Sequence, residues 1–423
     1  MAGIHGLIGA VPQYALMLRS QYWTAEELHR YIEANLAQSL AAAICIPFYR
    51  ERLGAMAPQP HELQSFPILS RAQIPDLSNS VRSLNPSGGK LVMSSRTSGS
   101  TGMPVDFFYD ARHQASRFAA RARYLRASGW SPLRRSVWFM STSAESTDAW
   151  FVRNGRFFGA SFASHNGDLE QQAEWLRERD PHHLYAFPVN LDGLAREFEA
   201  RRWRLNSLRR IFSGSEVLED SLRKRVRRVF GVEVSDNYGS TEAFLAWQCP
   251  AGSYHVNAEH VILEVVDDDG RPAPAGAMGR VLVTTLQNHL MPLIRYEIGD
   301  YAIAAQGSCR CGRILPLLGP ILGRAINLFV DGAGKRFVPW PLIRPIRARE
   351  WITQFQIVQS AVGRFAVRFV ADRDLSSQDE AEIIAHFETI ARGPATIEFQ
   401  RLTQIARAPS GKFMLAISEV ALD

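Results

Sequence analysis

Helix-like and strand-like segments alternate between residues 110 and 230, and this alternation constrains the fold more than any other feature. Short apolar runs such as SVWFM, HLYAF and LRRIFSG are separated by longer stretches that carry apolar residues at helical spacing. Strands that alternate with helices are typical of α/β domains, in which each strand feeds a loop. The pattern therefore predicts a large α/β domain.

After residue 250 the pattern changes to successive strands. HVILEVVD and GRVLVTTL are separated by the turn-rich segment DDDGRPAPAGAMG. From about residue 325 a smaller unit follows, with the strand FQIVQSAVGRFAVRFV, the helix SSQDEAEIIAHFETIARG and the strand ATIEFQRL in that order. We therefore expect an N-terminal α/β domain over residues 1–324 and a small α+β domain over residues 325–423. Near the N-terminus, residues 22–53 predict a helix that begins at Thr24 as its N-cap.

The composition is that of a globular protein, with 46% hydrophobic and 21% charged residues among 423. No apolar run reaches the roughly 18 to 20 residues that a membrane span needs. The mildly apolar N-terminus lacks the basic start of a signal peptide. We expect a cytoplasmic protein with no membrane partner.

Arginine supplies almost all of the positive charge, because only four of the 48 basic residues are lysines, Lys90, Lys224, Lys335 and Lys412. The densest basic run, Leu222 to Gly231, is compatible with a nucleic-acid patch or with the solvated face of an amphipathic helix. If the run is an amphipathic helix, the residues that face the core are Leu222, Val226, Val229 and Phe230. No nucleic-acid motif accompanies the run, so we favour the helix and expect no nucleic-acid partner.

Four short stretches carry chemistry. The loop SSRTSGSTGMP offers hydroxyls and unhindered backbone N–H groups, which suit phosphate, although Met103 stands where a Walker loop has lysine. DNYGSTEA supplies an aromatic ring, a glycine, a hydroxyl and a carboxylate in a row. LIRYEIGD ends in Asp300, and APSGK places the scarce Lys412 on a Ser-Gly turn.

The cysteines predict a metal site. Cys249 precedes His255 by six residues, and Cys309 and Cys311 lie in CRCGR. Three thiols and one imidazole are a usual tetrahedral zinc set, and a disulfide is the weaker interpretation in a reducing cytosol. The fourth cysteine, Cys45, is interpreted as a buried apolar residue.

Taken together, the motifs resemble the adenylate-forming superfamily of acyl-CoA ligases, luciferases and peptide-synthetase adenylation domains. The similarity is closer to its phenylacetate–CoA ligase and CapK-like branch, and it extends almost from end to end. It is carried by the ordered set IPFYRERL, FPILSRAQI, TSGSTGMP, IFSGSEVL, DNYGSTE, MPLIRYEIGD, CRCGRILP, Gly323-Arg324 and PSGK. The resemblance implies a large multi-sheet α/β domain followed by a mobile α+β domain, and relatives carry a comparable zinc set.

The resemblance also implies site residues. Lys412 is the catalytic lysine, brought by the small domain during the adenylation step. Thr241 touches phosphate, Glu242 holds Mg²⁺, Tyr238 stacks on adenine, and Asp300 accepts the ribose hydroxyls. The other nucleotide-binding residues are Thr97, Ser98, Gly99, Ser100, Thr101, Gly102, Ser213, Gly214, Ser215, Glu216, Asn237, Gly239, Ser240 and Arg324. Structural alternatives are Tyr238 as a core aromatic residue, Asp300 as a turn cap, and Glu242 and Lys412 as surface charges.

By position in the family, the acyl-substrate pocket draws on two segments, residues 138–150 and 185–190. The residues that we expect to line it are Phe139, Ser141, Glu145, Asp148, Tyr185, Phe187 and Pro188. Because Glu145 and Asp148 make the first segment polar, we expect an aryl acid with a polar or amino group.

Two departures from the family pattern bear on mechanism. Met103 replaces a frequent lysine, which weakens the grip on the triphosphate. Ile326 and Asn327 replace two acids at the hinge, and this puts the second half-reaction in doubt more than the first.

The predicted function is that of an ATP-dependent acid ligase, which forms an acyl-adenylate with Mg²⁺-ATP and transfers the acyl group to CoA. An amine acceptor, giving an amide, is the alternative, and a non-catalytic nucleotide-binding scaffold is a third possibility of a different class. Retention of Lys412, Glu242 and Asp300 argues against the scaffold. We expect a structural zinc, a small-molecule acid as substrate, and a monomer or homodimer.

Overall fold

The computed structural model describes residues 2–53, 60–84, 93–96, 105–140, 159–324, 328–337, 339–349, 351–405 and 414–420. Residue contacts divide the chain into two compact units, with the division between Ile321 and Leu322. Among the described helices, none combines the length and the apolar character required to cross a bilayer.

The first unit is built around an eight-stranded sheet with the order β13-β9-β8-β7-β6-β5-β3-β4. The strands β4, β3, β5, β6 and β7 are parallel, whereas β8, β9 and β13 continue the sheet antiparallel. Their bounds are β3 Ser136–Met140, β4 Ala160–Ser164, β5 His183–Tyr185, β6 Arg210–Gly214, β7 Val234–Gly239, β8 Phe244–Gln248, β9 Tyr254–Val256 and β13 Leu317–Leu318. The predicted α/β class is confirmed.

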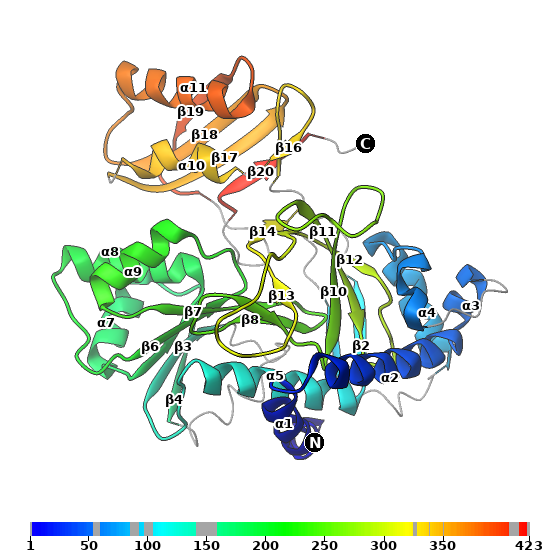
Figure 1. Ribbon diagram of the computed structural model, residues 1–423. Helices are drawn as coiled ribbons and strands as arrows, with labels where there is room; N and C mark the ends of the chain where they lie inside the picture. Colours follow the sequence, from blue (N-terminus) through cyan, green and yellow to red (C-terminus); the bar gives the residue numbers. More distant parts are fainter. Residues whose placement is uncertain are drawn as a thin grey trace. The chain divides into compact units, whose positions relative to one another are not determined.

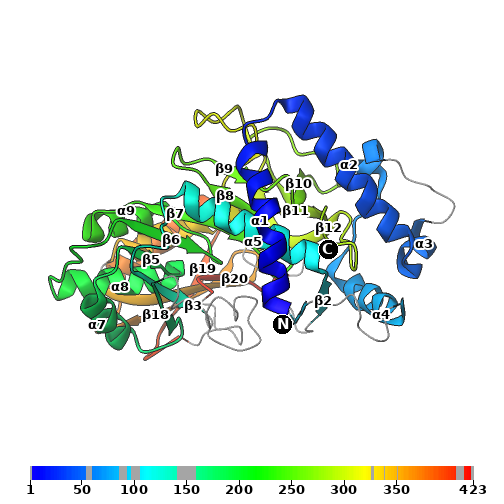
Figure 2. The same ribbon diagram turned by 90° about the horizontal axis from the view of Figure 1, so that it is seen from below.

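Helices cover both faces of this sheet (Figures 1 and 2). On one face lie α7 (Leu169–Arg179), α8 (Pro188–Ala200) and α9 (Asp220–Phe230). On the other face lies α5 (Ala111–Ala127), and α1 (Ala2–Ser20) packs across α5. Side chains alternate along β3. Val137 and Phe139 therefore pack in the core beneath α7, α8 and α9, whereas Trp138 and Met140 pack in the core beneath α5 and α1.

The basic run at 222–231 is the helix α9, as favoured from the sequence. Leu222, Val226 and Phe230 are buried, and Val229 packs beside them. Its arginines lie beside carboxylates, with Arg228 to Glu199 at 2.9 Å, Arg227 to Glu233 at 2.7 Å and Arg225 to Asp192 at 3.4 Å. The helix ends at Gly231, whose φ of 69° is the left-handed conformation that glycine adopts without strain.

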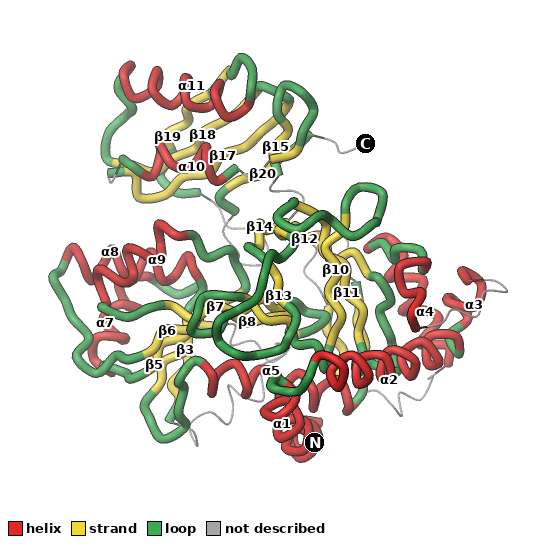
Figure 3. Tube along the Cα trace, viewed as in Figure 1, coloured by secondary structure: helices red, strands yellow, loops and turns green. Residues whose placement is uncertain are grey.

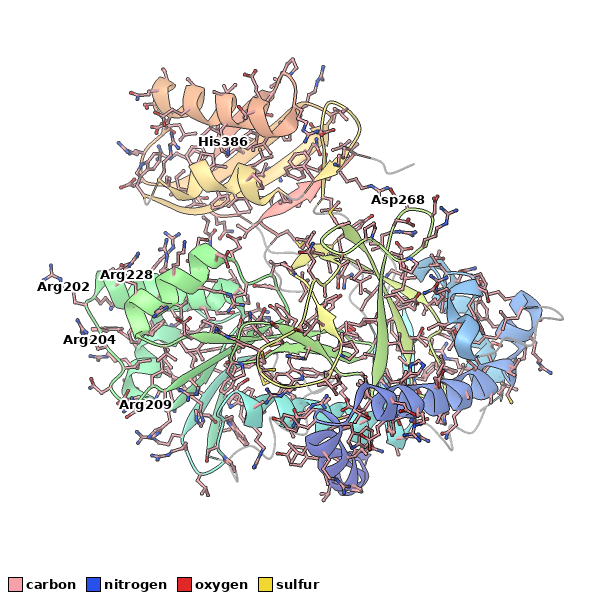
Figure 4. All side chains as sticks on the ribbon, in the orientation of Figure 1. Arg202, Arg204, Arg209, Arg228, Asp268 and His386 are labelled. Carbon is pink, nitrogen blue, oxygen red and sulfur yellow. The ribbon has the colours of Figure 1, made fainter. Side chains whose placement is uncertain are left out.

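Figure 4 shows Arg228 on α9, and Arg202, Arg204 and Arg209 on the segment that joins α8 to β6. These four arginine side chains are exposed.

A buried ion pair joins α5 to the segment after β9. Arg123 and Glu259 are both fully buried, and the guanidinium donates to the two carboxylate oxygens at 2.7 and 2.9 Å. Arg123 also donates to Asn257 Oδ1 at 2.8 Å and to the carbonyl oxygen of Met17 at 3.1 Å, while the Ser20 hydroxyl donates to Glu259. The pair therefore ties α1, α5 and the sheet together.

A second sheet in this part of the chain has four strands in the order β10-β11-β12-β14. It contains the two strands predicted after residue 250, and its bounds are β10 Val261–Val266, β11 Met278–Thr285, β12 Tyr296–Ile303 and β14 Ile321–Arg324. A small ribbon of β1 (Met93–Arg96) and β2 (Asp106–Tyr109) adds to the strands.

The N-terminal helices pack against the second sheet through a shared core. They are α2 (Ala25–Ile44), α3 (Pro47–Leu53), the 3₁₀ turns Pro60–Ser65 and Arg71–Gln73, and α4 (Ile74–Leu84). Thr24 is the N-cap of α2, as predicted, and forms a capping box with Glu27. The helix predicted to run to residue 53 instead ends at Ile44, because Pro47 cannot continue its hydrogen bonds and starts α3.

The second unit is a small α+β structure (Figure 3). Its sheet has the order β19-β18-β17-β20, with a two-stranded ribbon of β15 and β16. The bounds are β15 Phe329–Val330, β16 Arg336–Phe337, α10 Trp340–Arg347, β17 Ile352–Ala361, β18 Arg364–Ala371, α11 Ser377–Ala391, β19 Thr396–Arg401 and β20 Ala416–Ser418. Ile357, Val367, Ile383 and Phe387 are fully buried between the sheet and the helices.

Candidate functional site

Two residues predicted to bind nucleotide meet although they come from different sheets. Tyr238 lies in β7 and Asp300 in β12, and the Tyr238 hydroxyl donates a hydrogen bond to Asp300 Oδ2 at 2.7 Å. Both are buried, with 7% and 8% of their surfaces exposed. The phenol therefore fixes one carboxylate oxygen of Asp300.

The turn after β7 holds the predicted phosphate and Mg²⁺ residues in a defined backbone conformation. The Ser240 hydroxyl oxygen accepts from the backbone N–H groups of Glu242 and Ala243 at 3.2 and 3.3 Å. The carbonyl oxygen of Thr241 accepts from the Tyr109 hydroxyl at 2.7 Å. Glu242 is only 3% exposed and has no ion pair with any residue that the structure describes. A buried carboxylate of this kind suits a divalent cation.

A cation that the sequence did not point to also faces this turn. Arg117 of α5 donates from Nη1 to the Thr241 carbonyl oxygen at 3.2 Å and from Nη2 to that of Ser240 at 3.4 Å. Residues 113, 117 and 121 recur every four positions, which places them on one face of the helix. This spacing is the feature of the sequence that could have pointed to Arg117.

Two buried histidines lie behind the turn. The ring of His113 stacks on Tyr109 at 4.8 Å, and His260 lies 4.8 Å from His113. Burial, with the charge of Arg117 adding to it, lowers the pKa of His260 to about 3 and that of His113 well below its usual value. Both rings are therefore neutral near pH 7.

The segment Ser213–Glu216 begins with the last two residues of β6 and lies beside Asn237. Asn237 Nδ2 donates to the Ser213 carbonyl oxygen at 2.5 Å, and the Ser213 hydroxyl donates to that of Ala186 at 2.9 Å. A Cβ at Gly214 would approach Asn237 Nδ2 to 2.6 Å, so a larger residue there would force the Asn237 side chain to move. Glu216 Oε2 accepts from the Val189 N–H at 3.1 Å, which ties the segment to the start of α8.

Several predicted residues lie outside the described part of the chain. They are Thr97, Ser98, Gly99, Ser100, Thr101, Gly102, Met103, Ser141, Glu145, Asp148, Ile326, Asn327 and Lys412. Arg324 is described and ends β14.

The described residues predicted to line the acyl pocket lie on both faces of the large sheet. Phe139 is fully buried beneath α7, with its ring 5.7 Å from that of Trp175, whereas Tyr185 lies on the opposite face of the sheet. Adjacent residues of a strand point to opposite faces, so the residue of β3 that meets Tyr185 is Trp138. The assignment of Phe139 to the acyl pocket stays a prediction.

On the α5 face, Trp138 and Tyr185 stack with centroids 4.9 Å apart. Phe187 is half-buried and packs edge-on against Tyr185 at 6.2 Å, and Pro188 is the buried first residue of α8.

The four predicted metal ligands come together. The ligand atoms of Cys249, His255, Cys309 and Cys311 all lie within 4.8 Å of one another. Cys249 Sγ is 3.5 Å from Cys309 Sγ, and Cys311 Sγ is 3.2 Å from His255 Nε2. His255 Nδ1 is 3.3 Å from the Leu315 carbonyl oxygen, a contact that turns Nε2 toward the thiols.

Cys45 does not join this cluster, and it is exposed at the C-cap of α2. The prediction that Cys45 is buried was wrong, because the helix ends there and leaves the side chain on the solvent side.

Asp236, next to Asn237, has a raised pKa. Asp236 is 3% exposed, and its Oδ1 has no hydrogen-bond partner among the described residues. Burial raises its pKa from 3.8 to about 6, although Tyr254 donates to Oδ2 and Arg223 lies 4.0 Å away.

Between pH 4 and 6 the unfolded chain has lost this proton while the folded chain keeps it, so ionisation of Asp236 costs folding stability as pH rises. We expect Asp236→Asn to gain stability relative to the wild type over this window, by about 3 kcal/mol at most. Urea unfolding of both proteins at pH 4, 5, 6 and 7 measures the difference. A difference that stays constant with pH would show that the carboxyl group is not shifted.

Comparisons with known proteins agree with this geometry. Residues 77–291, just over half of the chain, match the family "AMP-binding enzyme", and residues 333–419 match the "CapK C-terminal domain". The phenylacetate-coenzyme A ligase of Thermus thermophilus is 32% identical over 173 residues, which are 39% of this chain and 39% of that enzyme. The enzyme of the same name from Escherichia coli is 24% identical over 71% of this chain and 73% of its own length.

Solved structures resemble the fold. A 2-hydroxyisobutyryl-CoA ligase in the postadenylation state, in complex with an acyl-AMP, superposes with a TM-score of 0.77 over 95% of this chain and 91% of its own, at 19% identity. An amide bond synthetase from Marinactinospora thermotolerans reaches 0.56 over 76% of this chain and 67% of its own, at 17% identity. At these identities the similarity establishes the shared fold.

Proposed function

Because the chain belongs to the AMP-binding enzyme family and carries a CapK C-terminal domain, we propose that it is an ATP-dependent carboxylic-acid ligase that transfers its acyl group to CoA. The observation that carries the proposal is the contact of Tyr238 with Asp300 beside the Ser240–Ala243 turn. A ring suited to base stacking and a carboxylate suited to the ribose are then in contact, and a hydroxyl and a buried carboxylate follow in the turn after β7, as a bound nucleotide requires.

In the proposed reaction, a carboxylate oxygen of the acid bonds to the α-phosphorus of ATP and the bond to the β-phosphate breaks, releasing pyrophosphate. The CoA thiol then attacks the acyl carbon, its proton is lost, and AMP leaves. Tyr238 would stack on adenine, Asp300 would accept from the ribose hydroxyls, and Thr241 would contact phosphate. Glu242 would hold Mg²⁺, which neutralises phosphate charge, and Lys412 would stabilise the charge that develops at the α-phosphate.

An amine remains the second candidate for the acceptor. It is favoured by Ile326 and Asn327 at the predicted hinge and by the fold shared with an amide bond synthetase. CoA is favoured by both curated relatives, which are named CoA ligases. Mass spectrometry of products formed with CoA, or with a panel of amines, separates thioester from amide.

We also propose that the Cys249, His255, Cys309 and Cys311 cluster holds a structural Zn²⁺. The donor set fits, because three thiolates and the Nε2 of an imidazole whose Nδ1 faces a carbonyl oxygen supply four ligands with none left open for substrate. Zinc would supply no step of the reaction there. A thiolate site of this kind and the other free cysteine, Cys45, suit the reducing cytoplasm, where we place the protein.

For domain organisation, we retain residues 325–423 as the mobile domain and 1–324 as the nucleotide and acid domain. We further propose that the protein acts as a monomer or homodimer on small molecules, without nucleic acid or membrane as a partner. The ion pairs along α9 support this for nucleic acid, because its arginines already lie beside carboxylates.

The test is acid-dependent pyrophosphate release with Mg²⁺-ATP, comparing Lys412→Ala with Lys335→Ala, an exposed lysine in the same unit. We expect Lys412→Ala to lower the rate by about 100-fold or more, because it removes a charge that stabilises the transition state. Lys335→Ala should retain the wild-type rate. If the wild type binds ATP yet releases no pyrophosphate with any of a broad set of acids, the scaffold alternative gains support.

A further inference from the structure

The peptide unit that joins Thr241 to Glu242 is held at both of its polar atoms. Its carbonyl oxygen, on Thr241, accepts from the Tyr109 hydroxyl at 2.7 Å and from Arg117 Nη1 at 3.2 Å. Its N–H, on Glu242, donates to the Ser240 hydroxyl oxygen at 3.2 Å. Because a peptide unit is planar, these bonds fix the plane that contains the Cα atoms of both residues. The direction in which the Glu242 side chain leaves the backbone is therefore set by this turn.

Tyr109 is a rigid donor to that peptide. It is 1% exposed, and its ring stacks on that of His113 with centroids 4.8 Å apart and an interplanar angle of 15°. Tyr109 ends β2, and the next residue, Asp110, is the N-cap of α5. Asp110 accepts from the His113 N–H at 2.8 Å and from the His289 N–H at 2.9 Å. The close packing around these groups holds the phenol oxygen in place.

The two donors to the Thr241 carbonyl oxygen differ in stiffness. The hydroxyl of Tyr109 is the nearer one and is carried by a stacked ring, whereas Arg117 reaches the turn through a long side chain with many rotamers. Removal of the hydroxyl would leave the carbonyl oxygen with Arg117 as its partner. The turn should then persist, but its peptide plane would no longer be fixed by a rigid group.

A shift of this peptide plane would be felt most by a divalent cation. Mg²⁺ takes oxygen ligands at about 2.0–2.1 Å in a nearly ideal octahedron, so its affinity falls when a carboxylate is displaced by a fraction of that distance. Glu242 is 3% exposed, and a side chain in a close-packed interior has few rotamers with which to follow a shift of its own Cα atom. The orientation of the peptide is thus transmitted to the carboxylate.

We propose, on the basis of the acid-ligase function above, that Tyr109 is a positioning residue for the magnesium site. Its hydroxyl orients the Thr241–Glu242 peptide so that the Glu242 carboxylate meets the Mg²⁺ of bound Mg²⁺-ATP. Tyr109 contacts neither the nucleotide nor the metal in this account, and it acts through the turn alone.

The test removes only the hydroxyl, in Tyr109→Phe, which keeps the ring and its stack on His113. Tyr49→Phe is the matched control, because Tyr49 is 3% exposed and its hydroxyl also donates to a backbone carbonyl oxygen, that of Pro292, at 2.7 Å. Isothermal titration calorimetry gives the Kd of ATP for each protein in Mg²⁺ and in EDTA. The ratio of the two Kd values is the gain in ATP affinity that Mg²⁺ provides, and the Kd in EDTA is the reference for folded protein.

We expect Tyr109→Phe to lower this gain by about 3-fold to 10-fold, the factor that one neutral hydrogen bond provides, and Tyr49→Phe to keep the wild-type gain. Glu242→Gln should lose most of the gain, because it removes the carboxylate charge. Addition of Tyr109→Phe to Glu242→Gln should then change little, since residues that act through one contact are not additive.

Pyrophosphate release from a broad set of acids, measured in parallel, separates this inference from the ligase function. Acid-dependent release by the wild type, together with an undiminished Mg²⁺ gain in Tyr109→Phe, would overturn the positioning role and leave the ligase standing. A gain that is reduced only in Tyr109→Phe, without release from any acid, would support the positioning role and contradict the ligase. The role would also be overturned by an equal loss in Tyr49→Phe, or by a loss from Tyr109→Phe that is as large in the Glu242→Gln background.

Discussion

Replacement of Glu259 by alanine is expected to lower the free energy of unfolding of the first unit by about 3 to 5 kcal/mol, because it leaves a buried charge without its partner. Arg123 is fully buried and donates to both Glu259 oxygens, at 2.7 and 2.9 Å. Its remaining acceptors, Asn257 Oδ1 and the Met17 carbonyl oxygen, are uncharged and cannot neutralise it. Urea unfolding followed by tryptophan fluorescence measures the loss.

Two further variants make this prediction specific. The double variant Arg123→Met/Glu259→Leu removes both charges and fills much of the space, so it should be clearly more stable than Glu259→Ala. Glu199→Ala removes the partner of exposed Arg228 at 2.9 Å and should unfold close to the wild type, because water screens that pair. A Glu259→Ala protein as stable as Glu199→Ala would show that the buried pair contributes little.

Removal of the proposed zinc is expected to have an effect of similar size. The four ligands come from the end of β8, from β9 and from the loop between β12 and β13, so a bound ion would cross-link segments about 60 residues apart in the chain. A ligand bound at a thousandfold excess over its Kd stabilises the folded state by about 4 kcal/mol, and we expect at least that much. The protein as purified should contain one zinc per chain.

Elemental analysis and thermal unfolding, with and without a strong chelator, test this prediction. Cys311→Ser should lose most of its zinc and unfold at a lower temperature. Cys45→Ser, which changes an exposed thiol outside the cluster, should keep the zinc content and the unfolding temperature of the wild type. A wild-type protein that contains no zinc after expression in zinc-supplemented medium, and that a chelator does not destabilise, would contradict the assignment.

The sequence predicted the elements of the fold well where periodicity and chain breakers are strong. SVWFM is β3, the strands after residue 250 are β10 and β11, and Thr24 caps α2. HLYAF was too long for a strand, because β5 stops at Tyr185 and Phe187 already caps α8, whose first residue is a proline. Local patterns identify such elements because the hydrogen bonds that define them are local.

Contacts across the chain were harder to predict. The bond between Tyr238 and Asp300 spans 62 residues, and the contacts of Arg117 with the Ser240–Thr241 turn span more than 120. The alternation along β3 separates Phe139 from Trp138, but it does not say which of them packs beneath α7 and which beneath α5. That choice depends on which helices pack on each face of the sheet, and this is a property of the tertiary structure.

The most direct test of the central claim is to identify what becomes of ATP. The protein is incubated with Mg²⁺-ATP, CoA and the acid panel, and AMP, ADP, pyrophosphate and phosphate are quantified together with the acyl product. Formation of AMP and pyrophosphate in equal amounts, only when a suitable acid is present, is the predicted result. Formation of ADP and phosphate, or ATP cleavage that does not depend on any acid, would contradict acyl-adenylate formation.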